Sequence, residues 1–382
     1  MTYPQVQVNQ IDLAQGAVTE TERYLLFIAS APNAAAAGLF YVNTQTDLAA
    51  VLGASNAVAM DVSAAMVNAG QNWAAAVCFI DPVATTWQDA VRDCQKSGSF
   101  EGVVLLDDFT EWNEEESNYS LRKAAQAAAA LRQEIIAKYG RWVWFILPVA
   151  DAAKGDMTWQ QYSVALTEWQ SGMAADGVML VPRVYQYLPG VIAGRLCNRL
   201  VTIADTPARV LTGSIVGPGD AVKDKDGKVI TEDIIQALDA ARYSVPVTYT
   251  DFEGIYWNDG PLLAAKGSDY QSIRILRIVD KVARQVRLLA IRNIGNRSLN
   301  STPSSVEYHQ MQFAKPLRTM AKSTTINGVS FPGEVYSPKE GDIVITWIDS
   351  THVNIYVQAR PTECPLVIGV NIMVDLSVQN EA

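Results

Sequence analysis

Two adjacent carboxylates, Asp107 and Asp108, directly follow an apolar stretch that we predict to be a buried strand. Carboxylate oxygens are the ligands that Mg²⁺ and Ca²⁺ prefer, and α/β enzymes often place them at strand ends. The loop that follows carries four more carboxylates: Glu111, Glu114, Glu115 and Glu116. Such a broad acidic stretch has three interpretations, namely a metal site, a solvated loop, or a surface that contacts a basic region of another subunit.

Other residue types that support catalysis are scarce or badly spaced. The two histidines, His309 and His352, have no partner at metal-ligand spacing, so we expect structural or surface roles. The motifs GxGxxG, GxxxxGK(S/T) and GxSxG do not occur in the chain, which favours a protein without a cofactor and without catalytic activity. The cysteines form no CxxC pair, and we expect small buried side chains in a reducing cytoplasm: Cys78, Cys94, Cys197 and Cys364.

Composition limits the partners that the chain can have. The 382 residues include 40 acidic and 30 basic side chains, which argues against nucleic acid as the main partner. Hydrophobic residues make up 49%, enough for sizeable cores in two domains. The uncharged apolar runs are far shorter than the ~18 residues that span a bilayer, and the N-terminus lacks the features of a secretory signal. We therefore expect no membrane insertion and synthesis in a cytoplasm.

The strongest pattern in the chain is a long helix predicted between Ser268 and Gly295, in a segment that begins at Gly254. Ser268 and Gln271 fit a capping box at the start of this helix, and Gly295 fits a helix stop. At about 100° per residue, its apolar side chains fall on one arc. Basic side chains fall on the opposite arc: Arg274, Arg277, Lys281, Arg284, Arg287 and Arg292.

This basic arc, which Asp280 interrupts, has a solvated face as its simplest interpretation. Six cations on one face repel one another unless something offsets their charge, which favours contact with an acidic protein surface. Nucleic acid is disfavoured because no aromatic residues interleave with the arginines. The cations for which we predict contact with an acidic surface of a partner or a neighbouring copy are Arg274, Arg277, Lys281, Arg284 and Arg287, and the acidic loop is their candidate counter-surface.

Residues 21–213 alternate strand and helix patterns. Continuous Val, Ile and Leu runs between amphipathic helices are typical of a parallel sheet with helices on both faces, so we predict an α/β domain here. The predicted strands are Tyr24–Ser30, Ala75–Ile80, Gly102–Leu106, Trp142–Val149 and Val178–Val181. The predicted helices are Asp47–Leu52, Ala57–Asn68, Thr86–Gln95, Ser117–Tyr139, Thr158–Met173 and Gly190–Thr202.

A Gly217-Pro218-Gly219 break lies close to a predicted domain boundary, after which residues 214–370 form an α+β domain. Besides the basic helix, this domain has a helix that we expect to kink at Pro316. Its predicted helices are Thr231–Arg242 and Ser304–Met320, and its predicted strands are Val245–Tyr249, Gly254–Trp257, Asp342–Ile348, His352–Gln358 and Leu366–Leu376.

Both ends of the chain, residues 1–20 and 371–382, are predicted to be extended arms. Apolar and polar residues alternate there, which is strand periodicity without enough apolar mass to fold alone. Such arms gain main-chain hydrogen bonds when they add to the sheet of a neighbour. The residues for which we predict this contact are Val6, Val8, Ile11, Ile372, Val374 and Leu376.

The whole chain resembles the tail sheath proteins of contractile-tailed bacteriophages and related injection machines. The resemblance is clearest over Leu188–Gly213, where a helix rich in small residues precedes a turn of the form D-x-P-A. It is also clear over Gly254–Asn296, with an aromatic strand, a polar turn and a helix of the form R-x-x-D-x-(V/I). The terminal GVNIMVDLS is similar to a sheath C-terminal arm.

The resemblance implies a subunit that polymerises with itself around a tail tube and contracts from a metastable extended state, without nucleotide hydrolysis. It also implies arms that insert into neighbouring copies, contacts with tube, baseplate and terminator proteins, and a location in the virion after assembly in the host cytoplasm. Two alternatives stay open: an α/β enzyme with an atypical site near Asp107 and Asp108, or another tail component such as a terminator or baseplate protein.

Overall fold

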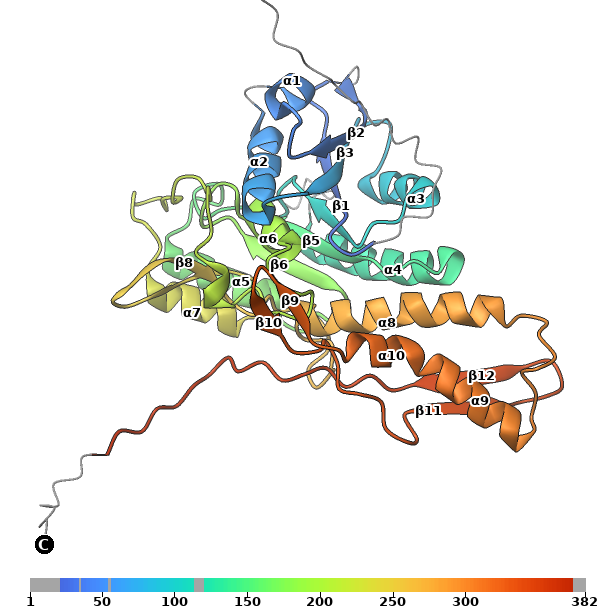
Figure 1. The fold of residues 1–382 in the computed structure, drawn as a ribbon. Coiled ribbons are helices and arrows are strands. Elements are labelled where there is room, and N and C mark those ends of the chain that lie inside the picture. The colour runs from blue at the N-terminus through green and yellow to red at the C-terminus, as the bar shows by residue number, and fades with distance from the viewer. Residues whose placement is uncertain (1–20, 34–35, 54–55, 113–119, 374–382) are drawn as a thin grey trace, which may run out of the picture.

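The computed structural model describes residues 21–33, 36–53, 56–112 and 120–373. Within these ranges the largest element is a six-stranded sheet with the order β2-β3-β1-β4-β5-β6 (Figure 1). All neighbouring strands are parallel except β2, which is antiparallel to β3 at one edge. The predicted parallel sheet is therefore confirmed, whereas β2 was not predicted. The strands are β1 (Leu25–Ser30), β2 (Gly38–Asn43), β3 (Ala74–Ile80), β4 (Gly102–Leu105), β5 (Trp144–Val149) and β6 (Val178–Pro182).

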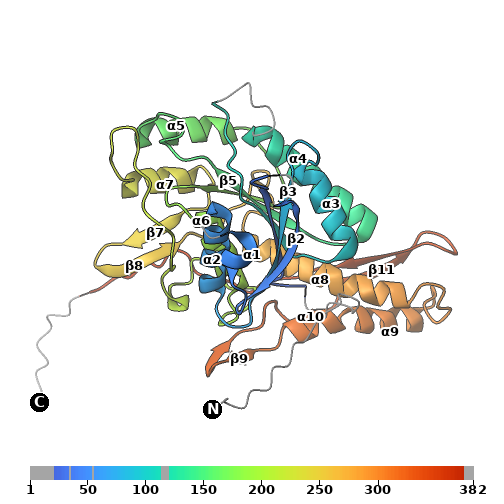
Figure 2. The same cartoon turned by 90° about the horizontal axis from the view of Figure 1, so that it is seen from above.

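Helices cover both faces of this sheet (Figure 2), with α2 and α6 on one face and α3, α4 and α5 on the other. Several helices begin after a side chain that accepts a backbone hydrogen bond from the first turn, which explains why the predicted starts lie close to the observed ones. The helices are α1 (Leu48–Leu52), α2 (Ala57–Ala69), α3 (Trp87–Ser97), α4 (Leu121–Tyr139), α5 (Trp159–Gln170), α6 (Leu188–Cys197) and α7 (Glu232–Ala240).

The C-terminal part is built around α8 (Ile273–Arg292), which lies below α4 in Figure 1. The predicted second helix is split at Ala314, shortly before Pro316, as expected. Its two pieces are α9 (Pro303–Phe313) and α10 (Lys315–Met320). Three hairpins complete the described chain: β7 (Pro246–Tyr249) with β8 (Phe252–Trp257), β9 (Thr324–Ile326) with β10 (Val329–Phe331), and β11 (Ile343–Trp347) with β12 (Val353–Val357).

Two local predictions for the C-terminal part are wrong. Helix α8 begins at Ile273 rather than at Ser268, because the N–H of Leu262 donates to Gln271 O over 2.8 Å and keeps the preceding chain extended. The strand predicted over Leu366–Leu376 is irregular chain in its described residues. No helix within the described ranges is long and apolar enough to cross a membrane.

The main hydrophobic core extends past the domain boundary predicted near residue 213. Trp257, Leu263 and Ile273 belong to the same buried cluster as the strands of the large sheet. A second, smaller cluster begins with Ile278 and Val282. Helix α8 thus contributes to both cores. The domain boundary near residue 213 remains a prediction, and the continuous main core on both sides of it does not favour a division there.

Candidate functional site

The basic face of α8 meets carboxylates of the same chain. Arg277 donates to Glu101, just before β4, from Nε over 2.6 Å and from Nη2 over 2.9 Å. Asp280 accepts hydrogen bonds from the two terminal nitrogens of Arg132 of α4, over 2.7 and 3.0 Å. All four side chains are at most 6% exposed. These two ion pairs join α8 to the α/β part of the chain, and we call this contact region the seam.

Burial and ion pairing shift the pKa values of the seam carboxylates in opposite directions. Burial alone would raise the pKa of Glu101, but Arg277 and Arg284 hold it below its ordinary value. Burial raises the pKa of Asp280, and the nearby Arg132 offsets this only in part. Ion pairs in such surroundings depend on both partners, because removal of one leaves a buried, uncompensated charge.

The cations of this face, for which contact with an acidic surface of another subunit was predicted, mostly meet carboxylates of the same chain. Arg277 is 2% exposed and is therefore not available to a partner. Arg287 keeps an exposed side chain, which lies against Gly140 at the end of α4. The other acidic partners are in this chain: Lys281 pairs with Glu334 at 2.7 Å, Arg284 with Glu22 at 2.9 Å, and Arg274 with Asp259 at 3.9 Å.

The predicted acidic counter-surface is also engaged within the chain, as far as the structure describes it. Asp107 accepts hydrogen bonds from the backbone N–H and the hydroxyl of Ser30, over 2.8 and 2.9 Å, at the end of β1. Glu111 accepts from Ser120 Oγ over 2.8 Å and from the N–H of Arg122 over 2.5 Å, at the start of α4. The loop's other three carboxylates lie outside the described residues: Glu114, Glu115 and Glu116.

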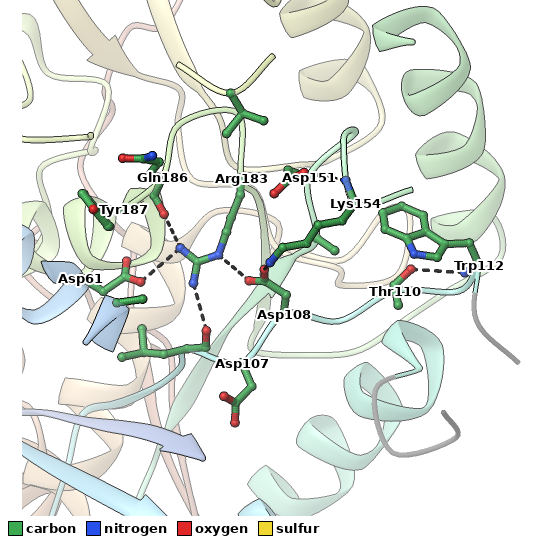
Figure 3. A pocket seen from close by; sticks show the side chains of 14 residues that line it. Asp61, Asp107, Asp108, Thr110, Trp112, Asp151, Lys154, Arg183, Gln186 and Tyr187 are labelled. Carbon is green, nitrogen blue, oxygen red and sulfur yellow. Dashed lines mark hydrogen bonds and ion pairs between the residues drawn. The ribbon is translucent and has the colours of Figure 1, made fainter. Parts of the chain in front are cut away.

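Asp108 lies in a pocket of about 640 Å³ at the carboxyl ends of β4, β5 and β6 (Figure 3). Arg183, which follows β6, points between Asp61 of α2 and Asp108. Its Nη1 lies 3.1 Å from Asp61, its Nε pairs with Asp108, and its Nη2 donates to Leu106 O over 2.9 Å. Lys154 reaches Asp108 from the other side at 2.5 Å. The centre of the pocket is thus an ion-pair network.

This network does not resemble a metal site. Asp108 faces two cations rather than a second ligand, and Asp107 turns toward Ser30. Among the described residues, no group of three His, Cys, Asp or Glu side chains is placed to hold a metal ion. The sequence therefore located two carboxylates at the sheet edge correctly, but the structure does not bring them together.

Asp61 gives this network a measurable pH dependence. Burial raises its pKa to about 6, although Arg183 opposes the shift. The folded state therefore binds this proton more tightly than the unfolded state, and stability should increase as the pH falls from 7 to 5, by roughly 1 kcal/mol. Urea unfolding of the wild type and of D61N at both pH values checks this. D61N should show a smaller increase, and an equal increase in both proteins would contradict the prediction.

Sequence reasoning missed the residues that complete the seam and the pocket. For two of these residues the signal that could have found them is a charge directly beside a strand buried on both faces, because such a charge requires a partner. Glu101 precedes the buried β4, and Arg183 follows the buried β6. The full set is Asp61, Glu101, Arg132, Lys154 and Arg183.

The predicted arms are described only near the C-terminus. From Cys364 to Met373 the chain has no regular secondary structure, and Figure 1 shows it running away from the body. Ile372 is 88% exposed there. The other predicted arm residues lie outside the described residues: Val6, Val8, Ile11, Val374 and Leu376.

The fold is that of a contractile sheath. It is similar to the sheath of an extracellular contractile injection system, PVC, in its contracted state, with a TM-score of 0.60 and 12% identity over 98% of each chain. It is also similar to the contracted helical sheath of the anti-feeding prophage, with a TM-score of 0.59 and 14% identity over 98% of this chain and 100% of that one. At these identities the likeness shows the fold alone.

Sequence comparison gives the family. Residues 3–261 match the N-terminal domain of DUF2586, and residues 269–377 match its C-terminal domain. A protein of Haemophilus phage HP1 (strain HP1c1) that is named as a tail sheath protein is 43% identical over 392 residues, covering 99% of this chain and 100% of the relative. The chain therefore belongs to this family of phage tail sheath proteins, and the resemblance seen in the sequence is confirmed.

Proposed function

We propose that many copies of this chain polymerise around a tail tube and contract from a metastable extended state, driving the tube through a target envelope. The full-length match to a tail sheath protein, together with a sheath fold over 98% of the chain, carries this proposal. The driving energy lies in the difference between two packings of the same subunits, so the role is mechanical rather than catalytic. The proposed partners are other copies, the tube, and baseplate and terminator proteins, in a virion assembled in the host cytoplasm.

The C-terminal arm is the proposed link between copies. In an extended strand, alternate side chains lie on one face, and the even positions of the described arm are all apolar. Such a strand gains hydrogen bonds and apolar burial when it adds to the sheet of a neighbour. These side chains are 53–88% exposed: Leu366, Ile368, Val370 and Ile372. We propose that Val374 and Leu376 continue this face.

The β11–β12 hairpin is the proposed acceptor of the arm in the neighbouring copy. Its strands pair from Ile343 with Val357 to Trp347 with Val353, and no other described strand pairs with either outer edge. Unpaired edges of this kind are ready to accept a further strand. We propose that the C-terminal arm adds to one edge and that the N-terminal arm, through Val6, Val8 and Ile11, adds to the other.

The triple variant I368T/V370T/I372T tests the C-terminal link. We expect a folded monomer whose yield of tubes is at least about tenfold lower, because each substitution removes apolar burial worth on the order of 1 kcal/mol. The matched control V367T/M373T changes the opposite face of the same segment and should polymerise like the wild type. Tube yield is measured by sedimentation and negative-stain electron microscopy, and equal yields for the two variants would count against the link.

Electron microscopy of the wild-type chain expressed alone separates this proposal from a different tail component. Long hollow tubes of uniform width are expected for a sheath subunit. A single ring of fixed size would instead indicate a terminator or baseplate protein. Compact particles call for co-expression with the tube protein, and tubes that then form support a sheath that needs its template.

We retain the proposal of partner contact for Arg287, which is the exposed residue among the five cations predicted to meet a partner.

A further inference from the structure

The first described residues, Thr21–Tyr24, lie at the seam, directly before β1. Arg23 has a φ of +70°, a left-handed conformation that costs about 1 kcal/mol or more for a residue other than glycine. Such a conformation persists only where the surrounding structure fixes it. The contacts of Glu22 and Arg23 therefore define how the N-terminal segment is attached to the fold.

Glu22 and Arg23 are held by partners that are distant in the sequence. Glu22 Oε1 accepts hydrogen bonds from Nη2 and Nε of Arg284, over 2.9 and 3.2 Å. The backbone N–H of Arg23 donates to Glu101 Oε2 over 2.5 Å. Arg23 Nη2 donates to Val201 O over 2.7 Å. Three separate parts of the fold thus bind two consecutive residues.

Glu101 connects this attachment to the rest of the seam. Its Oε2 accepts hydrogen bonds both from the backbone of Arg23 and from Arg277 of α8. One buried carboxylate therefore joins the start of β4, helix α8 and the N-terminal segment. Charge-assisted hydrogen bonds in such water-excluded surroundings are stronger than neutral ones at the surface.

The element that follows this attachment is central to the fold. Strand β1 lies between β3 and β4 in the sheet, and Leu25 to Ala29 are fully buried. A pull on the N-terminus that reached Leu25 would separate β1 from both neighbours and open the main core. Because Glu22 and Arg23 precede Leu25, their contacts meet such a force first.

We propose that Glu22, Arg23, Glu101 and Arg284 form a clamp that carries tension from the N-terminal segment into α8 and β4. The clamp shields β1 from being pulled out of the sheet when neighbouring copies shift during contraction. The inference rests on the proposed function, in which residues 1–20 link each copy to a neighbour. Glu22 and Arg284 act here as positioning residues that fix the root of the arm.

Force measurement on the full-length monomer tests the clamp without relying on assembly. Optical tweezers pull between the N-terminus and the loop of residues 293–302, so that the force crosses the clamp before any strand. We expect E22Q to lower the force of the first rupture roughly twofold, because it removes one of the charge-assisted attachments. The control E134Q breaks the surface pair of Glu134 with Arg92, at 3.0 Å, and should rupture like the wild type. A wild-type rupture force in E22Q would overturn the clamp.

A second measurement connects the clamp to contraction. Tails carrying E22Q should assemble normally and yield several-fold more broken sheaths after triggered contraction, counted by negative-stain electron microscopy. The E22Q monomer should melt within about 5 °C of the wild type. A larger loss of melting temperature with an unchanged rupture force would make Glu22 an ordinary stabilising residue and reject the clamp. Tails that lack residues 1–20 and still assemble and contract normally would instead refute the N-terminal link of the proposed function.

Discussion

The variant E101A is expected to lower the free energy of unfolding by about 3–5 kcal/mol. Glu101 is 1% exposed and accepts two hydrogen bonds from Arg277, which is itself 2% exposed. Alanine would leave the guanidinium of Arg277 buried without its counter-charge and would remove the acceptor of the Arg23 N–H. Urea unfolding of the monomer, followed by tryptophan fluorescence, measures the loss.

Two comparisons distinguish the effect of leaving Arg277 buried without a counter-charge from a general loss of stability caused by any substitution. D89A removes a surface contact with Arg92, at 2.8 Å, and should change the free energy of unfolding by less than about 1 kcal/mol. The double variant E101M/R277M removes both charges and should recover much of the loss, because apolar replacement of a whole buried pair is often neutral. If E101A is as stable as D89A, the seam does not depend on this ion pair.

The pH dependence of the seam follows from the same residue. The pKa of Glu101 is lowered in the folded state, so its stabilising contribution is present above the ordinary value of 4.5. That contribution is lost as the pH falls through the lowered pKa. The difference in stability between the wild type and E101A should therefore be constant near neutral pH and shrink only in acid.

Helix α8 shows what a local sequence pattern can predict about an element and what it cannot. The period of its apolar and basic residues predicted both a helix and two faces, because these properties depend on neighbouring turns. The pattern could not identify what the basic face contacts, since Glu101 lies 176 residues from Arg277 in the sequence. The argument that clustered cations require an offsetting charge was sound, but most of that charge is in the same chain.

Local sequence patterns did not predict the secondary structure where tertiary contacts determine it or where a strand is very short. The capping pattern of Ser268 and Gln271 is not used, because the chain before α8 pairs with residues 261 and 262. Strands β9 and β10 have three residues each, too few for an alternating pattern to show. Long buried strands such as β5 were predicted because their apolar runs are continuous.

The acidic pair at the sheet edge illustrates the same limit for a site. The apolar run before it fixed the position of Asp107 and Asp108 at the end of β4. The chain bends at Asp107, just after β4, and the two side chains meet different partners, Ser30 and Arg183. Arg183 follows another strand, β6, so only the assembled sheet brings it to Asp108.

The contact between α2 and α6 yields the second large expected effect. A Cβ atom added to Gly190 would lie 1.9 Å from the carbonyl oxygen of Asp61, and one added to Gly194 would lie 2.1 Å from that of Ala65. Both obstacles are helix backbone rather than flexible side chains. All residues of α6 are buried, so the helix has no room to move outward without opening the core.

G190A is therefore expected to destabilise the fold by at least about 3 kcal/mol, at the upper end of the range for overpacked cores. The two helices must separate, which also strains the hydrogen bond from the N–H of Gly190 to Asp61 Oδ1, now 3.2 Å. G38A in the edge strand β2 is the matched control, because its Cβ would lie 3.6 Å from the Phe40 ring, an ordinary contact. Urea unfolding of both variants measures the loss in the free energy of unfolding relative to the wild type. If G190A is as stable as G38A, the backbones of α2 and α6 do not require glycine at this crossing.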